Sequence, residues 1–137
     1  MNMRIALTLA ATASVLAACG KSEPQAPAIA PTQVAAVQTP PPEYPIELAC
    51  TGVGGKSVLT VVVGVEGAPT DVRLQASSGN AQLDESAQQR VREWKFKPAT
   101  RNGQAVPTTI QVPVSFNPPQ PRPDQCFVIE ERLRRGG

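Results

Sequence analysis

The sequence predicts an α+β fold, a small antiparallel sheet of about three strands with one main helix packed on one face. Three observations lead to this prediction. Residues 57–77 contain two strand-like stretches joined by a turn, residues 83–94 carry an apolar stripe at helical spacing, and residues 108–116 alternate between apolar and polar side chains. The order strand, strand, helix, strand therefore runs through the centre of the chain.

The first two strands are predicted to form a hairpin. SVLTVVVGV, at residues 57–65, is rich in β-branched residues and mostly apolar on both faces, which indicates a strand largely covered on both sides. The turn EGAP follows at residues 66–69. In the next stretch Val72, Leu74 and Ala76 alternate with polar residues, which predicts a half-exposed second strand.

The helix is predicted from the spacing of four apolar residues. Leu83, Ala87, Val91 and Trp94 follow one another at steps of four, four and three, which places them on one helical stripe. Acidic residues near the start of this stretch and basic residues near its end agree with the preference of the helix dipole.

The basic-aromatic stretch WKFK, at residues 94–97, has two interpretations, a nucleic-acid surface or the end of a core element. Phe96 follows Trp94 at strand spacing, and Pro98 prevents the helix from continuing. The whole chain has 13 basic and 11 acidic residues, a balance unlike that of a nucleic-acid-binding surface. We therefore expect a core anchor with outward lysines and no nucleic-acid partner.

The last strand is predicted at residues 108–116, TTIQVPVSF, after a tight turn at Asn102-Gly103. Apolar side chains share one face of this stretch, and Pro113 lies on the opposite parity. Because proline has no N–H to give to a ladder, the strand belongs at a sheet edge. The predicted core residues of the domain are Leu83, Val91, Trp94, Phe96, Val112, Val114 and Phe116.

The N-terminal residues predict export and a lipid anchor. Residues 1–18 form a predicted signal peptide, with one basic residue before a short apolar run. The run ends in LAAC, which resembles a bacterial lipobox with Cys19 as the lipidated residue; the alternative is an ordinary secretion signal with an incidental cysteine. By resemblance to lipoprotein sorting signals, Gly20 after the cysteine favours the outer membrane over the inner membrane. We therefore expect a protein on the periplasmic side of the envelope.

Most of the 15 prolines lie between Pro24 and Pro45 or between Pro118 and Pro123. This distribution predicts an extended tether at residues 19–42, a domain at residues 43–117 and a proline-rich tail at residues 118–137. Two cysteines remain besides the predicted lipidation site, Cys50 and Cys126. In an oxidising periplasm they are predicted to form a disulfide that pins the tail to the start of the domain, the alternative being two unpaired thiols.

Catalysis is not predicted. The chain has no histidine, which excludes Ser-His and Cys-His chemistry and histidine-based metal sites. Asp84 and Glu85 are interpreted as helix-start charges, and Ser77, Ser78 and Ser86 have no base in an evident arrangement. We therefore expect no enzyme activity, no cofactor and no metal.

The central domain resembles the C-terminal domain of the TonB family. The combination of motifs, rather than any one of them, carries the resemblance. In chain order the matching motifs are Tyr44-Pro45, the glycine turn at Gly67, Ser77 to Gly79, Leu83-Asp84, Trp94 to Ala99, Asn102-Gly103 and Val112 to Phe116. The resemblance covers residues 43–117 and implies a binding role with the same strand and helix layout.

The family resemblance also implies a partner. Such domains contact periplasmic segments of outer-membrane receptors through an edge strand, here residues 108–116, with Thr109, Gln111, Pro113 and Ser115 as the expected binding positions. The chain departs from an energy-transducing TonB because a lipobox and a tether stand where a transmembrane helix is expected. Two alternatives stay open: a structural envelope lipoprotein that self-associates as a homodimer, and a tail that covers the edge strand.

Overall fold

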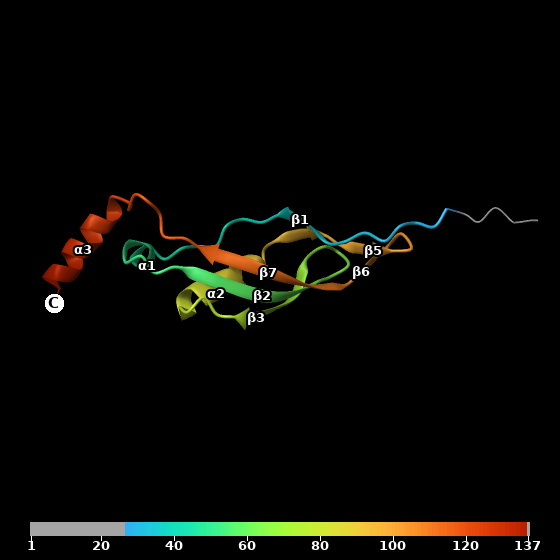
Figure 1. Cartoon of the computed structure of the whole chain (residues 1–137), viewed down its shortest axis with the longest axis horizontal. Helices are drawn as coiled ribbons and strands as arrows, with labels where there is room; N and C mark the ends of the chain where they lie inside the picture. The colour runs from blue at the N-terminus through green and yellow to red at the C-terminus, as the bar shows by residue number, and fades with distance from the viewer. Residues whose placement is uncertain (1–26, 137) are drawn as a thin grey trace, which may run out of the picture.

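The computed structural model describes residues 27–136, and the predicted signal peptide and Cys19 lie outside the described residues. Figure 1 shows an elongated molecule with α3 at one end and the N-terminal segment leaving at the other. The elements in chain order are β1 (Ala35–Gln38), α1 (Ile46–Cys50), β2 (Gly55–Val63), β3 (Pro69–Ala76), α2 (Ala81–Val91), β4 (Lys95–Lys97), β5 (Ala99–Arg101), β6 (Gln104–Val106), β7 (Thr108–Phe116) and α3 (Gln125–Arg135).

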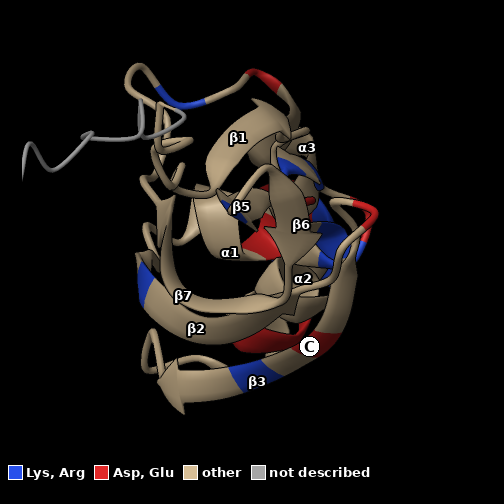
Figure 2. Ribbon diagram, turned by 90° about the vertical axis from the view of Figure 1, so that its right-hand side faces the viewer, with Lys and Arg blue, Asp and Glu red and all other residues tan. Residues whose placement is uncertain are grey.

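The main sheet has three antiparallel strands in the order β3-β2-β7. It curves around α2, which packs on its concave face (Figure 2). The predicted fold class is therefore confirmed. Two further antiparallel pairs, β1 with β4 and β5 with β6, lie beside this sheet and add strands that the sequence pattern did not predict.

The core forms between the concave face of the sheet and α2, and burial follows the predicted periodicities. Alternate residues of β2 and β7 point inward, and the helical stripe of α2 faces them. The fully or largely buried residues of this cluster are Leu59, Val61, Val63, Val72, Leu83, Ala87, Val91, Phe96, Val112, Val114 and Phe116. The opposite face of β2 is partly buried at Val58, Thr60 and Val62, in agreement with the prediction of a strand largely covered on both sides.

A buried carboxylate fixes the start of α2 against the sheet. Asp84 is 6% exposed and accepts hydrogen bonds from Ser57 Oγ on β2 at 2.7 Å, from the Ser78 backbone N–H at 2.7 Å and from Ser77 Oγ. Burial by itself would raise the pKa of Asp84, but these donors outweigh it and lower the pKa to about 2. The carboxylate therefore joins β2, the loop after β3 and α2.

This environment extends the interpretation of Asp84 as a helix-start charge. The capping role belongs to Asn80, whose Oδ1 accepts from the backbone N–H groups of Gln82 and Leu83 at 2.9 and 3.3 Å. Asp84 instead serves as an internal anchor in the first turn. The motifs Ser77 to Gly79 and Leu83-Asp84 therefore share a physical basis. Ser77 and Ser78 of the first motif both donate hydrogen bonds to the Asp84 carboxylate of the second.

Trp94 departs from the predicted helical stripe. Helix α2 ends at Val91, and a tighter turn follows in which the Trp94 N–H bonds to the Val91 carbonyl at 3.1 Å. Trp94 is half-buried against the core, and its indole N–H donates to the Pro40 carbonyl at 2.9 Å. The helix ends early because the chain must enter β4, which places Phe96 in the core.

The predicted tether is shorter than residues 19–42. Within the described chain, Thr32 pairs with Thr100, with reciprocal N–H to O=C bonds of 3.1 and 3.2 Å. Strand β1 then pairs with β4, and Val34 packs against the core. The final part of the predicted tether is therefore part of the folded domain.

The glycine turn after β2 has a steric reason. Gly67 has φ +80°, a conformation that side chains disfavour, and a Cβ at this position would lie 2.0 Å from the Phe96 carbonyl oxygen. The Phe96 N–H donates to the Gly67 carbonyl at 2.8 Å. Gly67 therefore lets the β2–β3 turn touch β4, which holds Phe96 in place.

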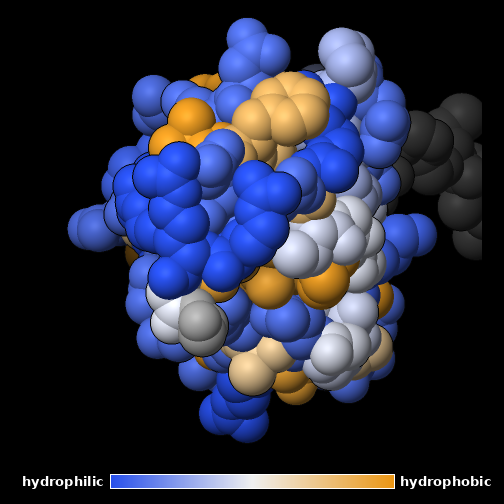
Figure 3. Space-filling model, turned by 90° about the vertical axis from the view of Figure 1, so that its left-hand side faces the viewer, coloured by the Kyte–Doolittle hydropathy of each residue, from blue (hydrophilic) through white to orange (hydrophobic). Residues whose placement is uncertain are grey.

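The predicted disulfide between Cys50 and Cys126 is present and joins α1 to α3. Cys126 is fully buried, whereas Phe127, Val128 and Leu133 are each more than 60% exposed. The end of the molecule seen in Figure 3 is largely hydrophilic, with separate apolar side chains between the charged ones. No helix among residues 27–136 is long and apolar enough to cross a membrane.

Candidate protein-binding edge

Strand β7 forms one edge of the main sheet. It pairs with β2 over nine consecutive residue pairs, from Gly55 with Phe116 to Val63 with Thr108, without a register shift. In the described part of the chain no other strand pairs with β7. The prediction of an edge strand from the proline within it agrees with this topology.

Pro113 fixes which backbone groups of β7 face away from β2. In an antiparallel ladder, hydrogen-bonded pairs alternate with non-hydrogen-bonded pairs. Pro113 lies opposite Val58 within the unbroken register, and it has no N–H, so this pair belongs to the non-hydrogen-bonded set. The same alternation turns the backbone groups of Thr109, Gln111 and Ser115 outward.

The outward groups are available for pairing. Among the described residues, no backbone or side-chain group outside β2 hydrogen-bonds to the N–H groups of Thr109, Gln111 and Ser115 or to the four outward carbonyls. The side chains of Thr109, Gln111, Pro113 and Ser115 are all exposed, and β7 has no charged residue. The structure thus presents three donors and four acceptors, with a donor missing at Pro113.

The C-terminal tail leaves this edge open. Residues Phe127 to Ile129 belong to α3, which lies beside α1 at the end of the molecule (Figure 1). The sequence left open a role for these residues as an edge-covering strand. The helix excludes that role in this structure, since no residue of the tail up to Gly136 bonds to β7.

Strand β3 forms the opposite edge and differs from β7 in register and in charge. Its register with β2 shifts twice, and it begins at Pro69. Asp71 and Arg73 form an exposed ion pair with a distance of 2.7 Å between Oδ2 and Nε. Bulges, prolines and charges are the devices by which proteins protect a sheet edge from pairing. The main sheet thus has one protected edge and one open edge.

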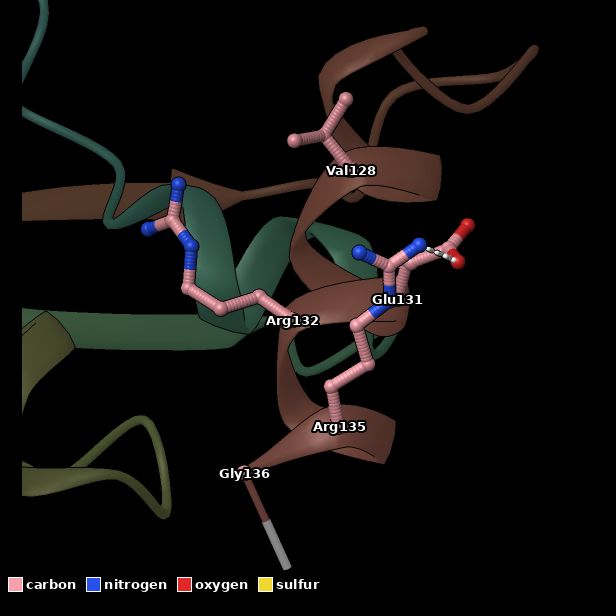
Figure 4. Close-up of a pocket in the computed structure, with 5 residues that line it drawn as sticks. All are labelled: Val128, Glu131, Arg132, Arg135 and Gly136. Atoms are coloured by element: carbon pink, nitrogen blue, oxygen red, sulfur yellow. Dashed lines mark hydrogen bonds and ion pairs between the residues drawn. The ribbon is translucent and has the colours of Figure 1, made fainter.

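A hollow of about 620 Å³ lies along α3, lined by Val128, Glu131, Arg132, Arg135 and Gly136 (Figure 4). Its charged groups are partly neutralised by an ion pair of 2.6 Å between Arg135 and Glu131. Glu131 is the one carboxylate that lines it, and it is exposed and paired with Arg134 and Arg135, so the hollow is a poor candidate for a catalytic site. Residues 27–136 hold no cluster of three or more potential metal ligands.

Comparison with known proteins identifies the domain. The profile of the family described as "Gram-negative bacterial TonB protein C-terminal" matches residues 40–118, more than half of the chain. The chain belongs to this family. The matched residues contain β2, β3, α2 and β7, so the open edge lies inside the TonB C-terminal domain, whereas β1 and α3 lie outside it.

Several curated relatives agree. The chain is similar to Protein TonB of Xanthomonas campestris pv. campestris, with 41% identity over 76 residues, which are 56% of this chain and 34% of the relative. It is also similar to Protein tonB2 of Pseudomonas aeruginosa, with 36% identity over 80 residues, 58% of this chain and 30% of the relative. The chain therefore spans about a third of the length of these relatives.

A solved structure has the same fold. The solution NMR structure of the Pseudomonas aeruginosa TonB CTD aligns with a TM-score of 0.54 at 20% identity and covers 62% of this chain and 86% of that one. At 20% identity this similarity shows the fold alone.

Proposed function

We propose that the protein is a lipid-anchored, TonB-like binding module of the cell envelope that captures an extended segment of another envelope protein on the outer side of β7. The observation that carries this proposal is the row of outward backbone groups at Thr109, Gln111, Pro113 and Ser115, which no described residue satisfies. Such an edge offers main-chain hydrogen bonds to an added strand. Membership of the TonB C-terminal family supports a binding role in the periplasm.

The proposed partner is an outer-membrane protein with a periplasmic extended segment, such as a TonB-dependent receptor. The names of the curated relatives support this class of partner, since they are TonB proteins. Anchoring through a lipid at Cys19, with the outer membrane as the destination, is part of the same proposal. A contribution to energy transduction would require a second protein that contacts the inner-membrane motor.

The proposal can be tested by removing one outward donor from each edge in turn. In Gln111→Pro the outward N–H of β7 is lost while the ladder to β2 keeps its donors. Leu74→Pro is the matched control on β3, because Leu74 lies opposite Leu59 and its N–H faces away from β2 by the same alternation. A photo-crosslinking residue replaces Thr109 in the full chain, and the captured protein is identified by mass spectrometry from intact cells.

We expect capture of an envelope protein whose yield falls by roughly three- to tenfold in Gln111→Pro, the loss expected for one or two hydrogen bonds. The yield should stay unchanged in Leu74→Pro, and thermal melts should show that both variants fold. Equal loss in both variants would contradict the edge assignment. Capture of a second copy of the chain alone would instead support the self-associating envelope lipoprotein.

A further inference from the structure

A groove of about 520 Å³ lies next to the start of β7. Its walls come from residues 31–33 ahead of β1, residues 99–101 of β5, and residues 106–109 from the end of β6 to the start of β7. The first segment is distant in sequence from the other two. The N-terminal segment, the β5–β6 hairpin and the start of β7 gather at the end of the molecule opposite α3 (Figure 1). The volume is typical of pockets that bind ligands, roughly 300–1,000 Å³.

The groove adjoins the first two residues of β7. Thr108 and Thr109 both line it. The outward backbone groups of Thr109 belong to the free edge of the same strand. A segment paired with β7 can therefore continue past Thr109 into the groove without leaving the surface.

The chemistry of the groove is cationic. Arg101 is the one charged residue among those that line it, and the others are threonine, glutamine, alanine, valine and proline. Arg101 is exposed and makes no ion pair with a carboxylate of the described chain. The paired backbones of Thr32 and Thr100 hold the residue next to Arg101 in place, which limits where its guanidinium can reach.

We infer that this groove is a specificity subsite, and that the segment captured by β7 places an acidic side chain, Asp or Glu, in it to pair with Arg101. This inference rests on the proposed function and adds the side-chain chemistry of the partner. It also gives the N-terminal segment a role in binding, because residues 31–33 form one wall of the subsite. Arginine suits a carboxylate since its planar guanidinium can donate two parallel hydrogen bonds.

The test uses a phage-displayed library of random linear peptides, selected on the full-length protein in detergent. Selections run in parallel on wild type, Arg101→Glu, Gln111→Pro and the control Arg92→Glu. Arg92 is an exposed arginine at the end of α2, so its variant carries the same charge change away from the groove. We expect wild type and Arg92→Glu to enrich Asp or Glu at one peptide position, and Arg101→Glu to enrich Lys or Arg there.

A synthetic peptide from the selection gives the magnitude. Replacing its acidic residue with the corresponding amide should weaken binding to wild type by about two- to fivefold, as expected for an exposed ion pair, and should leave binding to Arg101→Gln unchanged. Peptides that require Gln111 but keep the same charge preference in Arg101→Glu would overturn the subsite and leave the edge intact. If no selected peptide loses binding in Gln111→Pro, both the edge and the subsite are wrong.

Discussion

The two edges of the main sheet share β2 as their neighbour yet present opposite surfaces. Strand β7 runs through nine pairs without a shift and has no charged side chain, whereas β3 has two register shifts and an exposed Asp71–Arg73 ion pair. Figure 2 shows the difference as charge on β3 and none on β7. A lone sheet with two open edges would tend to pair at both. In the proposed function, protection of β3 leaves β7 as the edge that accepts an added strand.

The largest expected effect on stability comes from removing the disulfide. Its removal should not change the difference between the two edges. The loop between Cys50 and Cys126 spans 76 residues, for which the loop-entropy estimate is about 4 kcal/mol. We expect Cys50→Ala/Cys126→Ala to lower the free energy of unfolding by about 2 to 4 kcal/mol in urea titrations. Since no hydrogen bond joins α3 to β7 among the described residues, capture from Thr109 should persist wherever this variant is folded.

Chemical reduction of the wild-type chain provides the control for this variant, because it opens the same bond without changing a side chain. Capture lost together with the disulfide, in protein that circular dichroism shows to be folded, would mean that α3 takes part in binding.

An intermediate loss of stability should follow from lowering the pH. Acid protonates Asp84, whose carboxylate accepts a hydrogen bond from Ser57 on β2, the strand shared by both edges. The folded-state pKa of Asp84 is about 2, below the ordinary value of 3.8. Its contribution is therefore fully present above pH 4 and is lost as the pH falls towards 2, with a loss of about 2 kcal/mol. Urea titrations of wild type between pH 5 and pH 2 measure this loss.

Asp84→Asn is the matched variant, because it keeps the shape of the side chain and removes its titration. We expect it to be less stable at pH 7 and to lose the part of the acid dependence that comes from this residue. An unchanged acid dependence in Asp84→Asn would assign the effect to other carboxylates.

The variant with the smallest expected effect on stability tests the comparison of the two edges most directly. In Asp71→Thr/Arg73→Thr the charges of β3 are replaced with residues that favour strands, and loss of an exposed ion pair costs at most about 1 kcal/mol. We expect self-association to rise in sedimentation experiments on the full-length chain. A variant that stays monomeric would show that the register shifts, rather than the charges, protect β3.

The elements β2, α2 and β7 were predictable. Each buries one face against the others, so apolar residues recur in its sequence at strand or helix spacing. Helix α3 carried a signal too, since CFVIEERLRR has no proline and follows Pro123-Asp124, but the prolines before it suggested an extended tail. Strand β1 carried no such signal in its sequence. Its four exposed residues, AAVQ, pair because β4 offers them an edge, and such tertiary context overrides local propensity.

The candidate site was predicted in part, because one part of it depends on local sequence and the other on tertiary contacts. Proline parity within residues 108–116 placed the edge and its outward positions, because a missing N–H is a property of one residue. The groove at Arg101 was not predictable, since residues 31–33 are more than 60 residues from the other walls and meet them through the Thr32–Thr100 bridge. Asp84 was assigned a helix-start role because its partners, Ser57 and Ser77, come together only after folding.

The Thr32–Thr100 bridge also has a mechanical meaning. Any tension carried by the chain ahead of residue 32 enters the domain at this pair of backbone hydrogen bonds and then loads the short β1–β4 ladder. These two bonds are not part of the β2–β7 ladder, so they can part without breaking a pair of the main sheet. Stretching would therefore reach the wall of the groove first, so that a pull on the N-terminal segment reshapes the site before it strains the sheet.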